Sequence, residues 1–81
     1  MNKQELRKRL MEEGVMESAY SLEGGLPWDQ YVLSEDSAGN WSVYYSERGE
    51  KLGLRTFRTE DEACLYMLQR ILADPTTRRR V

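Results

Sequence analysis

The sequence predicts an α+β fold, a two-layer sandwich in which a four-stranded antiparallel meander is covered by an N-terminal and a C-terminal helix. The stretch Trp41–Gly49 is rich in aromatic and β-branched residues and lies between turn-forming residues, which is typical of a strand. Segments with apolar residues three and four apart lie at both ends of the chain. At 81 residues the chain is one small domain. We expect residues 1–75 to form it and residues 76–81 to be a flexible basic tail.

The first helix is predicted from about residue 3 to residue 13. Asn2 and Glu5 have the spacing of an N-cap and its capping-box partner. Leu6 and Leu10 are four apart and share one apolar face. Gly14 is suited to the position after the helix, because glycine adopts the left-handed conformation that ends many helices.

Four strands are expected in the middle of the chain. Gly24 and Gly25 indicate a hairpin turn after the first strand. Side chains alternate between the faces of a strand, so Trp41, Val43 and Tyr45 should share one face of the third strand. The strands are expected at residues 20–23, 30–35, 41–46 and 52–57.

The second helix has the clearest start signal in the chain. Thr59 can cap the first turn and Glu62 can return the bond. The apolar stripe that follows comprises Cys64, Met67, Leu68, Ile71 and Leu72. Pro75 disfavours helix at the residue before it, so the helix should end near Asp74.

Composition argues against several functional classes. The chain has no histidine and one cysteine, Cys64, which is expected in the core, so we expect no enzyme activity, no metal site and no cofactor. No apolar run is long enough to cross a bilayer, and the first residues do not resemble a secretion signal, so we expect a cytoplasmic protein without a membrane partner. Residues 15–40 carry five carboxylates and no cation, which argues against nucleic acid as a direct ligand and favours a basic protein partner.

Three stretches resemble a known bacterial family. They are Tyr20-Ser-Leu-Glu-Gly-Gly25 followed by Asp29, the run Trp41-Ser-Val-Tyr-Tyr-Ser-Glu-Arg-Gly49, and Phe57-Arg-Thr-Glu-Asp-Glu-Ala-Cys64. The pattern is similar to that of small immunity proteins of polymorphic-toxin and contact-dependent growth inhibition systems. The resemblance implies an antitoxin that binds the toxic C-terminal domain of a delivered effector, often a nuclease, and covers or distorts its active site.

A basic toxin domain would meet the acidic part of this chain. The expected partner contacts are Glu23, Trp28, Asp29, Glu35, Asp36 and Glu47. We expect Asp29→Lys or Glu35→Lys to weaken partner binding without unfolding the domain.

Two interpretations stay open from sequence. Trp28 lies in a loop, so it is either folded onto the core or presented to a partner. The alternative function is a small homodimeric regulatory or adaptor domain without a toxin partner, which would pair through an exposed strand edge. The free protein is expected to be a monomer or a weak dimer.

Overall fold

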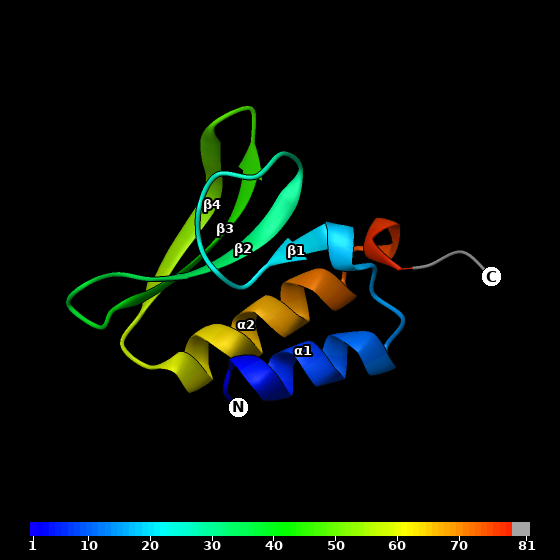
Figure 1. Cartoon of the computed structure of the whole chain (residues 1–81), viewed down its shortest axis with the longest axis horizontal. Helices are drawn as coiled ribbons and strands as arrows, with labels where there is room; N and C mark the ends of the chain where they lie inside the picture. Colours follow the sequence, from blue (N-terminus) through cyan, green and yellow to red (C-terminus); the bar gives the residue numbers. More distant parts are fainter. Residues whose placement is uncertain (79–81) are drawn as a thin grey trace.

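The computed structural model describes residues 1–78 and has two layers, a four-stranded sheet and a pair of helices on one of its faces (Figure 1). The predicted fold class, the order of the elements and the helical layer are confirmed. The elements are α1 (Lys3–Glu12), the 3₁₀ helix η1 (Glu17–Ala19), β1 (Tyr20–Ser21), β2 (Gln30–Glu35), β3 (Trp41–Glu47), β4 (Glu50–Phe57), α2 (Glu60–Leu72) and the 3₁₀ helix η2 (Pro75–Thr77).

Both helices begin at the predicted caps. The Asn2 side chain accepts a hydrogen bond from the Glu5 amide at 2.9 Å, and the Glu5 carboxylate accepts from the Asn2 amide at 3.1 Å. Thr59 Oγ1 accepts from the Glu62 amide at 3.2 Å. These side chains satisfy amides that have no partner within the helix, so the two starts are fixed locally.

The sheet differs from the prediction in its first pair. The strands lie in the order β1-β2-β3-β4, and β2–β3 and β3–β4 are antiparallel as expected. β1 and β2 are parallel, with Tyr20 beside Tyr31 and Ser21 beside Val32. The sheet is therefore mixed, and Gly24-Gly25 does not form a hairpin turn.

The segment between β1 and β2 returns the chain across the sheet instead. Its Gly24 amide donates to the Leu33 carbonyl at 3.0 Å, which extends the contact with β2. The Tyr44 hydroxyl then donates to the Gly25 carbonyl at 2.7 Å, from the sheet face opposite the helices. Figure 1 shows this loop passing across the strands. Because it covers that face, Val32, Tyr44 and Ser46 are buried although they point away from the helices.

The main core lies between the sheet and the helices. α2 packs on β2, β3 and β4, and α1 lies beside α2 (Figure 1). The core comprises Leu6, Leu10, Val15, Tyr20, Leu22, Tyr31, Leu33, Trp41, Val43, Ala63, Cys64, Met67, Leu68 and Ile71. Trp41 and Val43 belong to it as the alternation predicted, and Tyr45 packs against it while half-buried.

β4 is one of the two edge strands of the sheet and carries an irregularity. Its register with β3 shifts between Val43 and Tyr45, where Gly53 adopts φ +64°. The extra residue turns Leu52 and Leu54 to different faces, whereas plain alternation would place both on one face. Both leucines are exposed.

The predicted boundary at residue 75 is wrong for the residues that follow it directly. Thr77 is buried, and its hydroxyl donates to the carbonyls of Ile71 and Asp74. Its own carbonyl accepts from the Met16 amide at 2.8 Å, and Arg78 pairs with Val15. Thr76 to Arg78 therefore belong to the domain, while the rest of the predicted tail, residues 79–81, lies outside the described residues.

Candidate functional site

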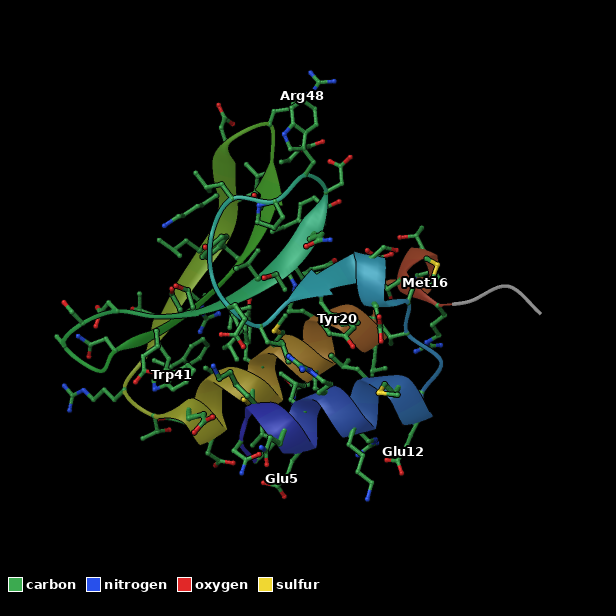
Figure 2. The ribbon with its side chains drawn as sticks, in the orientation of Figure 1. Glu5, Glu12, Met16, Tyr20, Trp41 and Arg48 are labelled. Carbon is green, nitrogen blue, oxygen red and sulfur yellow. The ribbon has the colours of Figure 1, made fainter. Side chains whose placement is uncertain are left out.

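The six predicted contact residues divide between the two ends of the β2–β3 pair. Gln30 pairs with Ser46 at one end of this pair and Glu35 pairs with Trp41 at the other. The six-residue length of β2 separates the ends by roughly 20 Å. Figure 2 shows the two ends, with Arg48 at one and Trp41 at the other.

Glu23, Glu35 and Asp36 belong to the Trp41 end, and two of them already have partners in the chain. Glu23 forms an ion pair with Lys3 at 3.4 Å. The Asp36 carboxylate accepts the amides of Ala38 and Asn40, both at 2.9 Å, and so holds the turn before β3. These hydrogen bonds, led by the one from Asn40, lower the pKa of Asp36. Because Glu23 and Asp36 already bind groups within the chain, this end of the sheet is the weaker candidate for a partner-binding site.

Trp28, Asp29 and Glu47 come together at the opposite end. Asp29 directly precedes Gln30, and Glu47 directly follows Ser46, to which Gln30 is paired. The Trp28 side chain is 71% exposed, so the structure places it at the surface and not on the core. Asp29 has φ 55°, a left-handed conformation that fixes the chain direction as it enters β2.

A pocket of about 190 Å³ opens beside these residues. We call it the Asp29 pocket. It is lined by Met16, Ser18, Ala19, Asp29, Tyr31, Tyr45, Asp74, Thr76 and Thr77. The residues come from η1, the start of β2, the end of β3 and η2, so distant parts of the sequence meet here. Tyr31 and Tyr45 are directly opposite each other in the sheet, and their rings meet edge to face with centroids 4.9 Å apart.

Asp74 is held in place by its neighbours. Its Oδ2 accepts from the Tyr31 hydroxyl at 3.0 Å, and its Oδ1 accepts from the Thr76 amide at 3.0 Å and from the Thr76 hydroxyl at 2.6 Å. These hydrogen bonds, led by that from the Thr76 hydroxyl, lower the pKa of Asp74. The carboxylate is therefore charged at neutral pH and fixed in direction.

The pocket has negative electrostatic character. Burial raises the pKa of Tyr45, and the charges of Asp29, Glu47 and Asp74 raise it further, which shows that all three carboxylates act on this phenol. Burial also raises the pKa of Tyr31, as does its hydrogen bond to Asp74, while the nearby Arg70 opposes the rise. Within residues 1–78, none of these three carboxylates lies within 4 Å of a cationic nitrogen.

This arrangement suits a positively charged side chain. Carboxylates can accept from an ammonium or guanidinium group, and the tyrosine rings offer faces and edges against which its stem can pack. Among the residues that the structure describes, no group of histidine, cysteine and acidic side chains is placed to hold a metal ion. The side chains that line the pocket are suited to binding a cation through its charge and its shape.

Of the residues that line the pocket, the predicted contact set contains Asp29 alone, while Trp28 and Glu47 lie at the same end of the sheet outside the lining. Tyr31 was placed only in a strand and Asp74 only at the end of a helix. Asp74 is 45 positions from Asp29, and no local pattern links the two. The start of β2 and η2 meet only because of the fold.

Comparison of the chain with family models, with curated proteins and with solved structures finds no match. No helix within residues 1–78 has the length and apolar character needed to cross a membrane. The site geometry is therefore the basis for a functional interpretation.

Proposed function

We propose that this chain is a cytoplasmic immunity protein that binds the toxic C-terminal domain of a cognate bacterial effector, a nuclease, and holds it inactive. The observation that carries the proposal is the Asp29 pocket beside the exposed Trp28. Asp29 and Asp74 line the pocket together with two tyrosines, and the charge of Glu47 acts on the same phenol. The exposed Trp28 directly precedes Asp29 in the chain, and together these residues form a surface suited to a basic partner. The family resemblance of the strand and helix motifs supports the same interpretation.

The proposed contact places a lysine or arginine of the toxin in the Asp29 pocket. Asp29 and Asp74 bind the cation, Tyr31 and Tyr45 contact its aliphatic stem, and Trp28 packs on the surface around it. Glu47 extends the negative field and speeds encounter with a basic domain. A nuclease carries cations where it binds the phosphate backbone, so occupying one of them blocks access of the nucleic acid.

The proposal is tested with the product of the open reading frame immediately upstream. Its C-terminal domain is expressed with and without this chain, and growth and co-purification are measured. We expect growth arrest that this chain relieves through a stoichiometric complex. A non-toxic domain that forms no complex would contradict the antitoxin function.

Two matched substitutions test the site within that complex. Asp29→Asn removes the charge while asparagine tolerates the left-handed backbone, and Glu35→Gln removes one charge at the other end of the sheet. We expect Asp29→Asn to raise the Kd about tenfold, as for loss of a charged interface contact, and Glu35→Gln to change it less than twofold. An equal effect of both would show that only overall charge matters.

Trp28→Ala tests the apolar part of the same contact. An exposed tryptophan that becomes buried at an interface is a frequent hot spot, so we expect the Kd to rise by about 30-fold or more. Its melting temperature should be unchanged, because the indole contributes little to the core of the free protein. Unchanged affinity would place the interface elsewhere.

The homodimeric regulatory or adaptor domain is the second candidate, because within residues 1–78 β4 leaves one edge of the sheet open to another strand, although the charges and the register shift of that edge oppose pairing with an identical copy. Light scattering coupled to size-exclusion chromatography distinguishes the two. A stable dimer without affinity for the toxin domain would favour the adaptor, and a free monomer that binds the toxin would exclude it.

A further inference from the structure

The free edge of β4 forms a second surface, separate from the Asp29 pocket. β4 pairs with β3 on one side and with no strand on the other in the part of the chain described. All seven positions from Glu50 to Thr56 are exposed. Such an edge presents unpaired backbone amides and carbonyls to which another strand can add.

Three cations border this edge, and each is positioned by a tyrosine ring. Lys51 Nζ lies 4.8 Å from the centre of the Tyr44 ring. The Arg55 guanidinium lies 5.1 Å from the centre of the Tyr66 ring, and that of Arg70 lies 6.0 Å from it. Arg70 Nη1 also donates to the Tyr66 hydroxyl at 3.3 Å. These contacts restrict long side chains that would otherwise move freely.

The cations lie on both faces of the edge. Lys51 pairs with Ser46 and lies on the face covered by the loop between β1 and β2. Arg55 pairs with Val43 on the helical face, and Arg70 extends from α2 to the same Tyr66 ring that Arg55 contacts. Within residues 1–78 none of the three is within 4 Å of a carboxylate oxygen, whereas Lys3 and Arg9 have such partners.

We infer that β4 receives an extended acidic segment of a partner protein as an added strand. Side chains of an added strand alternate between the faces, so its carboxylates can meet Lys51 on one face and Arg55 and Arg70 on the other. Leu52 and Leu54, 41% and 50% exposed, supply apolar contact between these charges. Backbone pairing gives affinity, and the cations select an acidic sequence.

The same features disfavour a second copy of this chain as the occupant. Cations outnumber Glu50 along β4, so two such edges repel each other. The register shift at Gly53 also bends the strand, a feature that protects edges against pairing with an identical strand. Lys51, Arg55 and the backbone edge of β4 lie outside the Asp29 pocket, and only Arg70 also acts on it, through its charge near Tyr31. Binding at Lys51 and Arg55 is therefore expected whether or not the toxin is the partner at the pocket.

The test uses the full chain and a capped eight-residue peptide in which pairs of glutamates alternate with pairs of valines, so that carboxylates occupy both faces. Amide chemical shifts and hydrogen exchange are followed by NMR during titration. We expect shift changes and slowed exchange along β4, with binding that weakens as salt increases. The matching peptide with lysines in place of glutamates should not bind.

Charge reversals then assign the cations. Arg55→Glu, Arg70→Glu and Lys51→Glu should each weaken binding of the glutamate peptide about tenfold, and Lys8→Glu on the exposed surface of α1 should change it less than twofold. Equal binding of the lysine peptide, shifts confined to other elements, or no binding would overturn the inference. A dimer whose β4 amides are protected without peptide would also overturn it, because the edge would then be occupied by a second copy.

Discussion

The hydrogen bond from Tyr44 to the Gly25 carbonyl should anchor the loop that leads to the candidate site. The Tyr44 ring is 2% exposed and its hydroxyl lies 2.7 Å from that carbonyl. Tyr44→Phe keeps the buried ring and removes the hydroxyl, so the Gly25 carbonyl loses its donor within the protein. A part-buried hydrogen bond of this kind contributes about 1 kcal/mol to the free energy of unfolding. For a domain of 81 residues this loss lowers the melting temperature by roughly 4–8 °C.

Thermal denaturation followed by circular dichroism measures the global effect, and exchange of the Gly24 amide measures the local one. That amide donates to the Leu33 carbonyl, so its exchange should accelerate about fivefold if the loop opens more often. Tyr45→Phe is the matched control, because within residues 1–78 the Tyr45 hydroxyl makes no hydrogen bond. Equal melting temperatures of the two variants would refute the anchoring role.

Three further predictions test other parts of the domain. Burial raises the pKa of Cys64 to about 11, above its ordinary value of 9.0, so on raising the pH the unfolded chain loses this proton before the folded chain does. The free energy of unfolding, measured by urea denaturation, should therefore fall as pH rises from 9 to 11, and Cys64→Ala should show a smaller fall. Thr77→Val should lower the free energy of unfolding by about 1 kcal/mol in the same assay, because the carbonyls of Ile71 and Asp74 each lose one of their donors, and an unchanged value would mean that this hydroxyl adds nothing to stability. Leu33→Ala removes a fully buried core side chain and should cost about 3 kcal/mol, measured by chemical denaturation; a loss below about 1 kcal/mol would mean that this part of the core repacks.

Local chemistry explains which parts of the fold could be predicted from sequence. The helix starts at Asn2 and Thr59 depend on side chains within three residues of the amides that they cap, so the sequence alone locates them. The faces of β3 follow from alternation, which is also local. The shift at Gly53 was missed because an isolated glycine in a strand does not reveal whether it forms a bulge.

The C-terminal residues show the opposite case. A proline followed by polar and basic residues near a chain end has the composition of a loose tail, and this composition gave the predicted boundary at residue 75. Thr77 is nevertheless buried, because Met16 donates to its carbonyl and the end of α2 accepts from its hydroxyl. These partners are separated in sequence by up to 61 residues, and composition carries no information about them.

The direction of β2 explains both the error in topology and the missed walls of the pocket. If Gly24 and Gly25 had formed a hairpin, β2 would begin beside the end of β1, and Asp29 would lie far from η2. Because β1 and β2 are parallel, β2 begins where β1 begins, next to η1, and the Gln30 side chain donates to the Ser18 carbonyl at 2.9 Å. η2 contacts the same region through Met16, so Asp29 and Asp74 line one pocket. The loop held by Tyr44 reverses the chain, and it therefore creates the site as well as covering the sheet.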